Sequence, residues 1–580
     1  MKSKKPSKRK RWRRIILYSF LSLFGLLVAA ITLLFIFLED IVEARIRDLL
    51  EKRFGGYYTL EWESIEKDIG WSEMTFVVHE AKLTSDTTDV EGLKHYPIVF
   101  FETKELRIKN LSTWDILWGK KVDLDLIELV HPDCILFSKG KKREQSKKEK
   151  KRQLSVIELE QFSLVNGKLA IYDFATKERI LYNDALSAQV NWIKLDLNKM
   201  DNFIDGFQYE DFIVNSWDAE LTPLKGFYEF EIDTIRLRSR DKFLQLKNID
   251  IRTSESLKEI SKTKINHAEV IKAFVEEINL QGLNTEELIY SDRLRIQTVM
   301  VDGARIAIFK NKLTYLEPTF QKKVLNSIFR SVTYPIRADT VKIENLNLIF
   351  ELLTSEEKEP AYITLDEVKG YLANINTNPS SKDTLKVSVD GVLLEKGDLH
   401  LDLDIAIQDS IKNYQKFRGY LQSMPFSALN QTIQNFVNIK IVNGWIDRLD
   451  FAGYTNDKKS WGTVAFRYHD LEMDIYSFKD KSEKKKNGFL TGVAKMAIHR
   501  TNPLPNGDLR TASFEYIRER WEGSVMLWLG GTLMGVFKTT LKDFVLDIIQ
   551  NREEKSLKKV EKEMKKKKRE EERQMQKELK

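Results

Sequence analysis

The segment Leu399-His400-Leu401-Asp402-Leu403-Asp404-Ile405-Ala406-Ile407 decides the fold of this chain of 580 residues. Its odd-numbered positions are apolar, and its even-numbered positions are polar or small. Because successive side chains of a β-strand point to opposite faces, this alternation predicts a strand with one apolar side and one water-facing side. The candidates for the lining of an apolar surface are therefore Leu399, Leu401, Leu403, Ile405 and Ile407.

The same alternation continues upstream of this segment, at residues 385–389. Asp390-Gly391 and Lys396-Gly397-Asp398 lie between the two runs and are typical turn residues. Strand-like sequence recurs at residues 122–130, 167–174, 226–239, 243–253, 294–309 and 340–352. The chain is therefore predicted to be mainly β.

A loose internal repeat runs through the middle of the chain. Residues 155–173, 295–311 and 338–352 each read as a strand, a short break and a second strand. We interpret the pattern as a succession of hairpins that extend one sheet. Such a sheet has two possible forms: an elongated, curved antiparallel sheet whose apolar face lines an open trough, or a closed β-sandwich or barrel. Periodicity alone favours the closed form.

The N-terminus carries the pattern of a membrane anchor. Residues 1–14 contain nine Lys and Arg residues and no acid, and Ile15 to Leu38 is uncharged. A helix of this length, at ~1.5 Å per residue, spans a ~30 Å hydrocarbon core. No small-x-small cleavage site ends the run. We therefore expect a cytoplasmic tail (1–14), a single transmembrane helix (15–38) and a chain that lies across the membrane after Glu39.

Other segments have helical spacing. Residues 39–56 predict a juxtamembrane helix that ends at Gly55-Gly56. Residues 266–283 and 316–332 have apolar residues three and four apart, which predicts two helices that interrupt the sheet. Residues 551–580 predict a charged helical tail, with Glu and Lys four residues apart.

The segment 513–550 is rich in large apolar residues and is predicted to be an apolar or amphipathic helix. Its run from Ser524 to Phe537 is short for a membrane span and contains three glycines. Docking on the sheet and insertion at a membrane interface both fit this pattern. Trp521, Trp528 and Phe537 are the candidates for contact with a membrane or a partner protein.

The composition does not predict a catalytic protein. Most of the net charge of +7 is accounted for by the N-terminal tail, so the rest of the chain has no basic excess for nucleic acid. Cys134 is the single cysteine, so no disulfide forms within the chain. The seven histidines are scattered, and phosphate-loop, nucleophile-elbow and zinc-protease motifs are absent from the sequence. We expect no catalytic residue, no metal and no cofactor.

One part of the sequence resembles a known family. Gly370-Tyr371-Leu372, the strands up to residue 407, the Met424-Pro425-Phe426 step into a short helix, and GTVAFRYHDLEMDI (462–475) are similar to the conserved C-terminal region of AsmA-like proteins. The order of anchor, amphipathic helix and EWESIEKDIGWSEMTFVVHEAKL (61–83) is similar as well. Residues 140–360 are similar to the family only in their general pattern of strand-like sequence.

The resemblance implies a repeating β-groove and a place in the bacterial envelope, because AsmA-like proteins are related to chorein-type bridges that carry phospholipid between membranes. It favours the open trough, with an N-terminal and middle groove (57–369) and an AsmA-like β region (370–512). The expected function is to conduct phospholipid from the inner towards the outer membrane, from an inner-membrane anchor with the bulk of the chain in the periplasm. Expected partners are membrane phospholipids and an envelope protein at the C-terminal end. The alternative is a non-catalytic scaffold or assembly factor for outer-membrane proteins.

Overall fold

The computed structural model describes residues 58–69, 73–85, 98–112, 121–138, 156–196, 206–222, 227–378, 383–407, 414–436, 439–480, 483–486, 496–543 and 545. The expected cytoplasmic tail (1–14), transmembrane helix (15–38), juxtamembrane helix (39–56) and charged tail (551–580) lie outside these residues. Among the helices of the described ranges, none has both the length and the apolar character needed to cross a membrane.

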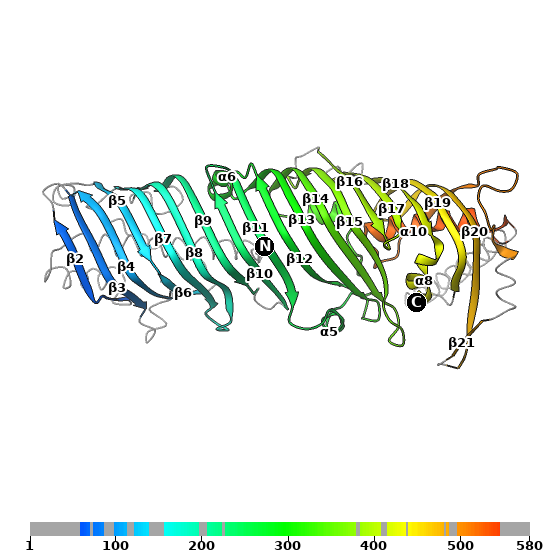
Figure 1. Cartoon of the computed structure of the whole chain (residues 1–580), viewed down its shortest axis with the longest axis horizontal. Coiled ribbons are helices and arrows are strands. Elements are labelled where there is room, and N and C mark those ends of the chain that lie inside the picture. The colour runs from blue at the N-terminus through cyan, green and yellow to red at the C-terminus, as the bar shows by residue number, and fades with distance from the viewer. Residues whose placement is uncertain are drawn as a thin grey trace, which may run out of the picture. The chain divides into compact units, whose positions relative to one another are not determined.

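The described chain is mainly β, as the alternation predicts (Figure 1). The strands are β1 (Tyr58–Glu61), β2 (Ser64–Ile69), β3 (Glu73–Ser85), β4 (Ile98–Ser112), β5 (Lys121–Val130), β6 (Asp133–Ser138), β7 (Val156–Asp173), β8 (Arg179–Asp196), β9 (Phe207–Leu221), β10 (Tyr228–Arg238), β11 (Phe243–Thr253), β12 (Glu269–Gln281), β13 (Leu294–Asn311), β14 (Ile336–Leu353), β15 (Ala361–Asn376), β16 (Thr384–Leu393), β17 (Gly397–Ala406), β18 (Gln415–Pro425), β19 (Ile439–Thr455), β20 (Lys459–Asp480), β21 (Glu483–Lys486) and β22 (Thr511–Ile517).

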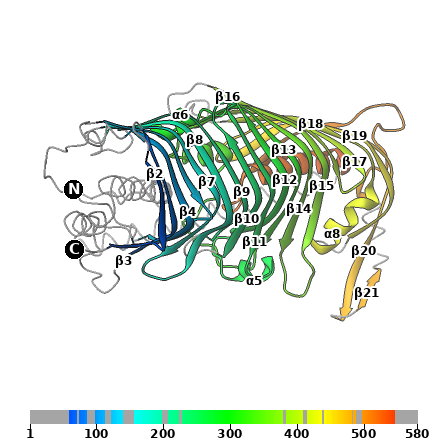
Figure 2. The ribbon, with the colours of Figure 1, turned by 60° about the vertical axis from the view of Figure 1, so that its left-hand side comes forward.

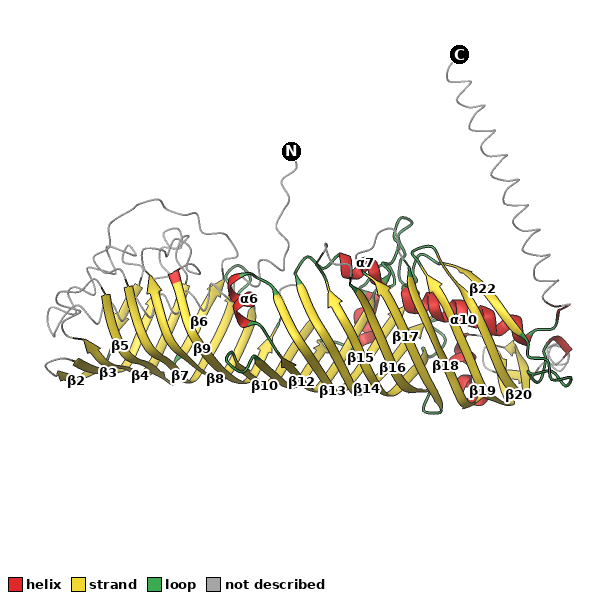
Figure 3. Cartoon of the chain, turned by 90° about the horizontal axis from the view of Figure 1, so that it is seen from above, coloured by secondary structure: helices red, strands yellow, loops and turns green. Residues whose placement is uncertain are grey.

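Short helices connect or cover these strands (Figure 3). They are α5 (Leu257–Lys262), α6 (Thr285–Tyr290), α7 (Leu325–Arg330), the 3₁₀ turn η2 (Phe426–Leu429), α8 (Asn430–Phe436) and the longer α10 (Ser524–Thr540). The chain divides into two compact units. Unit 1 comprises Met1–Ile260, Ile271–Ile306 and Tyr334–Lys342, and unit 2 comprises Ser261–Val270, Ala307–Thr333 and Ile343–Lys580.

The sheet of unit 1 is mixed. β1, β2 and β4 pair antiparallel with β3, and β4 also pairs with β5 and β6. β7 pairs in parallel with both β5 and β6. From β7 to β12 each strand pairs antiparallel with the next. The prediction of a purely antiparallel sheet is therefore wrong at β5–β7, where two short strands lie end to end beside one long strand.

The sheet of unit 2 is antiparallel in the pairings from β15 to β20, and β22 then pairs with β20. η2 and α8 connect β18 to β19, and α10 packs on β19, β20 and β22. β16 and β17 form the expected hairpin, but its turn is at residues 394–396. The predicted turn residues Asp390-Gly391 and Gly397-Asp398 belong to the paired strands instead.

Long strands contain a residue with a left-handed backbone conformation in their interior. In unit 1 such residues include Asn110 (φ 54°), Asn166 (φ 51°), Asp218 (φ 53°), Asn248 (φ 50°) and Gly303 (φ 64°). Asn, Asp and Gly are the residues that adopt this conformation most readily. The strand registers shift near Asn110 and Asn166 and skip a position at Asp218 and Asn248. Such bulges bend a strand and increase its twist.

The bulges of neighbouring strands lie side by side. The register of β10 and β11 passes from Ile232 opposite Ile249 to Thr234 opposite Lys247, so that Asp233 and Asn248 stand outside the ladder. The Asn248 amide donates a hydrogen bond of 2.9 Å to the Asp233 carboxylate.

The registers of β9–β10 and β11–β12 skip positions in the same way, at Asp218 and at Glu276. The bends therefore form a line across the sheet of unit 1, and the strands curve as Figure 2 shows.

These bulges explain two wrong predictions. Residues 155–173, 295–311 and 338–352 are not hairpins; each lies in one continuous strand, β7, β13 or β14, and the expected break is the bulge. Residues 266–283 are not a helix, because they contain β12. The bulge at Glu276 shifts the alternation, so apolar residues fall at 271, 274, 275 and 278, which imitates helical spacing. In the segment 316–332 only α7 is helical.

The first prediction concerns the bend. Asn248→Val places a β-branched side chain in the left-handed region and removes the hydrogen bond to Asp233, which should lower the free energy of unfolding of the full chain by ~2 kcal/mol. Asn248→Gly keeps the backbone conformation and should cost about half as much. Urea unfolding measures both variants. Equal losses would show that the left-handed conformation at Asn248 does not matter.

Candidate functional site: an apolar sheet face

Strands β9 to β12 of unit 1 carry rows of apolar side chains on one face. Residues that are direct cross-strand partners share a face of the sheet, so the register defines these rows. From β10 through β11 to β12 the rows are Leu237–Leu244–Leu280, Ile235–Leu246–Ile278, Ile232–Ile249–Val275 and Phe230–Ile251–Ala273. On β9 they continue through Val214, Ser216, Ala219 and Leu221.

Most of these side chains are only half-buried. The buried members are Ile249, Val275 and Ala273, at 7–9% exposure, whereas the others on β10 to β12 keep part of their surface in contact with solvent. Strands β3 to β8 differ, because their apolar residues form a continuous buried cluster that includes Ile108, Ile127 and Ile193. A row of accessible aliphatic side chains on a sheet face marks a surface for apolar ligands.

The opposite face of the same strands is polar, and its charges pair with one another. Arg252 pairs with Glu229 at 3.2 Å and also contacts Glu231, and Lys247 pairs with Glu277 at 3.7 Å. Exposed pairs of this kind contribute about 0–1 kcal/mol each, and they leave little charge free for a ligand. The two faces therefore differ in chemistry, and only the apolar one is suited to hydrocarbon.

The apolar face of unit 2 is covered by helices. The Trp528 ring of α10 lies 6.1 Å from the Phe417 ring, and both belong to one buried cluster. Gly531 and Gly535 bring α10 close to the sheet: a Cβ atom would lie 2.6 Å from Phe514 at Gly531 and 2.6 Å from Val464 at Gly535. Any larger residue at these two positions would force α10 away from β20 and β22.

The five predicted lining residues of β17 are not equivalent. Leu399 and Leu401 are half-buried, whereas Leu403, Ile405 and Ile407 have exposures of 7%, 1% and 1% and belong to the core of unit 2. The Asn326 amide, next to the start of α7, donates a 3.1 Å hydrogen bond to the carbonyl of Ala406 and holds α7 over this end of β17. The structure thus brings Leu399, Leu401, Leu403 and Ile405 to one face of β17, with Ile407 just beyond the end of the strand, and leaves only the first two accessible.

The three predicted contact residues of the C-terminal segment are also separated. Phe537 is 61% exposed, and Trp528 is buried at 7%. The Trp521 ring lies against the ammonium groups of Lys310 and Lys312. The segment 513–550 is not wholly helical, because residues 513–517 belong to β22, which pairs with β20. Deletion of the whole segment would remove a strand and part of the core.

In the part of the chain that the structure describes, no group of three or more His, Cys, Asp or Glu side chains is placed to hold a metal ion. Burial raises the pKa of the Cys134 thiol to about 12, which keeps it protonated and unreactive. His400 lies on the polar side of β17, 2.8 Å from Asp390 and 3.3 Å from Asp402. The first contact joins β16 and β17 and the second lies within β17, as is typical of a water-facing strand surface.

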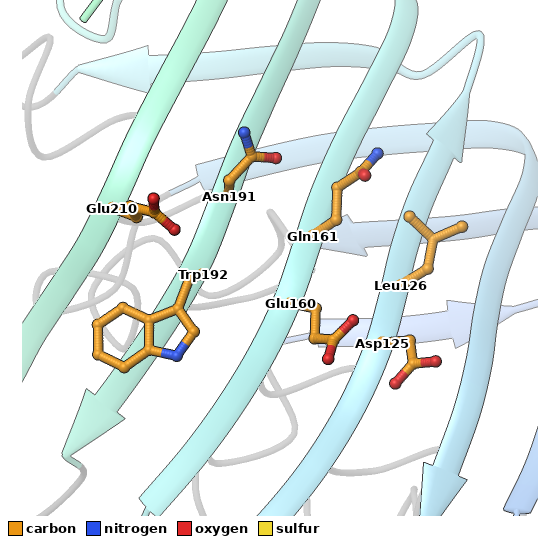
Figure 4. A pocket seen from close by; sticks show the side chains of 7 residues that line it. All are labelled: Asp125, Leu126, Glu160, Gln161, Asn191, Trp192 and Glu210. Atoms are coloured by element: carbon orange, nitrogen blue, oxygen red, sulfur yellow. The ribbon is translucent and has the colours of Figure 1, made fainter. Parts of the chain in front are cut away.

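An open depression of about 500 Å³ lies across β5, β7, β8 and β9. Its lining residues are Asp125, Leu126, Glu160, Gln161, Asn191, Trp192 and Glu210 (Figure 4). Asp125 accepts a hydrogen bond of 2.6 Å from Asn110, and Glu210 pairs with Arg240 at 2.6 Å. Trp192 has a left-handed backbone (φ 45°), so the depression follows a row of bulges. We interpret it as a consequence of the bend.

No family model matches the chain, and no curated protein matches it. The candidate site therefore rests on geometry. Sequence analysis recognised β10 and β11 as strands but did not select their apolar residues. The sequence Leu-Lys-Asn-Ile-Asp-Ile (246–251) contains the pattern that could have identified them. Asn248 stands between two alternating runs and marks the bulge, and the bulge places the apolar residues of both runs on one face.

The second prediction separates accessible from buried lining residues. Leu403→Asp buries a carboxylate in the core of unit 2 and should lower the free energy of unfolding by several kcal/mol. Leu401→Asp, two residues away on the same face, should cost less because its carboxylate reaches water. Thermal unfolding of the purified variants measures both. Similar losses for the two would mean that the face is closed at Leu401 too.

Proposed function

We propose that this protein is a membrane-anchored envelope protein that binds phospholipid acyl chains on its apolar sheet face and conducts them along it. The observation that carries the proposal is the set of half-buried aliphatic rows on β10 to β12. Each CH₂ group removed from water contributes ~0.8 kcal/mol, so a face of this kind suits long hydrocarbon chains better than compact polar ligands.

Two sequence features support the proposed function. The basic, then uncharged, start of the chain is suited to an inner-membrane anchor with a cytoplasmic N-terminus and the bulk of the chain in the periplasm. The resemblance of residues 370–475 to AsmA-like proteins implies a repeating β-groove and lipid transfer. The proposed mechanism is non-catalytic: acyl chains lie on the apolar face, and headgroups stay in water.

The alternative function, a scaffold for outer-membrane proteins, would require accessible sheet edges. Strands of a client protein bind to sheet edges through backbone hydrogen bonds. The accessible apolar area described above lies on a face, where a strand has no backbone group to bond. The exposed chemistry therefore favours lipid over a protein strand.

The third prediction tests the proposal on the full chain extracted from membranes. Native mass spectrometry should detect bound phospholipid, and Ile235→Asp should reduce the bound amount severalfold by placing a charge among the rows. Arg236→Asp is the matched control, because the next residue of the strand points to the opposite face and should leave lipid binding unchanged. Absence of lipid from the wild type, or equal loss in both variants, would refute the proposal.

A further inference from the structure

Helix α10 presents an apolar stripe on the side away from the sheet. Val525, Leu529, Leu533 and Phe537 have exposures of 62%, 36%, 44% and 61%. They are spaced four residues apart, so they follow one side of the helix over about 18 Å. The opposite side holds Trp528 and the glycines against the core, so the stripe points away from the core formed by the described residues of unit 2.

The N-terminal end of this stripe meets a group of cations. The Trp521 ring has the Lys310 Nζ at 4.9 Å and the Lys312 Nζ at 3.8 Å from its centroid. Lys310 is 1% exposed; it pairs with Glu269 at 3.1 Å and donates a 3.1 Å hydrogen bond to the Trp521 carbonyl. Lys322 contacts the same Glu269 oxygen, so one carboxylate serves two ammonium groups.

Burial lowers the pKa of Lys312, and the carboxylates of Glu522 and Glu519 lie close enough to raise it against this lowering. Glu522 accepts hydrogen bonds from the Tyr516 hydroxyl at 2.7 Å and from the backbone N–H of Glu519 at 2.9 Å. The first turn of α10 contains no acidic residue. The guanidinium groups of Arg518 and Arg520 donate to backbone carbonyls of the neighbouring loops. Burial lowers the pKa of His267, which is close to Lys310 and Lys312 and stays neutral. Five cations, Lys310, Lys312, Lys322, Arg518 and Arg520, thus gather near four carboxylates, Glu269, Glu519, Glu522 and Asp457, which leaves an excess of one positive charge at this end of the stripe.

We propose that α10 and this cation group form a subsite for a single anionic phospholipid. The phosphate lies at Lys312 beside Trp521, and an acyl chain runs along Val525, Leu529, Leu533 and Phe537. The inference rests on the proposed lipid-binding function and names the lipid class and the place. Charge complementarity selects an anionic headgroup, and a tryptophan between apolar and wet surroundings is typical of a lipid headgroup boundary. The C-terminal tail 551–580 is mostly charged, so it suits this apolar stripe less well than an acyl chain does.

Photo-crosslinking in the full-length protein tests this subsite. A photoreactive amino acid replaces Leu529 in one sample and Ile235, in the rows of unit 1, in another. The protein is incubated with vesicles of phosphatidylcholine, with and without phosphatidylglycerol. We expect the Leu529 position to capture phosphatidylglycerol in preference. Lys312→Gln should reduce that capture about fivefold, the effect of one basic residue near a headgroup.

Two further variants act as controls. Lys323→Gln removes an exposed lysine of the same loop and should leave capture unchanged. Phe537→Ser shortens the exposed stripe and should reduce capture of both lipids.

Capture at Ile235 but not at Leu529 would overturn the subsite and leave the proposed function standing. Equal capture of the two lipids, unaffected by Lys312→Gln, would overturn the headgroup assignment. Crosslinking of Leu529 to a protein, or to residues 15–38 of this chain, would replace the lipid with that occupant. No lipid at either position would refute the proposed function and this inference together.

Discussion

The residues that leave the ladder inside neighbouring long strands, several of them with a left-handed backbone, are the constraint on which the shape of the unit 1 sheet depends. A single bulge would only distort its own strand. Where Asp218, Asp233, Asn248 and Glu276 stand side by side outside the ladder, four neighbouring strands bend at one line. Gly303 lies next on this line, because a Cβ atom there would be 2.5 Å from the Glu276 carboxylate. The alternation of apolar and polar residues slips by one position at the bend. Because the extra residue there also turns the backbone by one position, the apolar side chains before and after the bend lie on the same face.

The two units use the same kind of apolar face in different ways. In unit 1 the rows on β10 to β12 are half-buried, whereas in unit 2 α7 and α10 close over Leu403, Ile405 and Phe417. The difference follows from the sequence that comes after the strands. Gly530, Gly531 and Gly535 let α10 lie directly on Phe514, Tyr516 and Val464. Helix α10 covers the sheet with one side and exposes the apolar stripe from Val525 to Phe537 on the other. Unit 2 therefore has its accessible apolar surface on a helix and not on the sheet.

The strands, their faces and the β16–β17 hairpin could be predicted from the sequence, because alternation and turn residues are local signals. The bulges could not be predicted, because one extra residue between two alternating runs has the same sequence pattern as other structures. At 155–173 it resembles a hairpin, and at 266–283 it resembles a helix. The sequence also could not predict which apolar residues of β17 are buried and which are accessible. Leu401 and Leu403 both lie between polar residues in the sequence, and packing against segments distant in the sequence, such as α7 about 75 positions away, makes one accessible and the other core.

The buried Lys310 shows that unit 2 is not built for stability alone. An ammonium group that is 1% exposed carries a large desolvation penalty, and burial lowers its pKa to about 8 despite the nearby Glu269. An apolar residue at this position would avoid that penalty. The lysine instead joins three segments distant in the sequence, through Glu269, its own strand β13 and the carbonyl of Trp521. It thus fixes the start of α10 against the sheet and, at the same place, keeps a positive charge at the end of an apolar stripe.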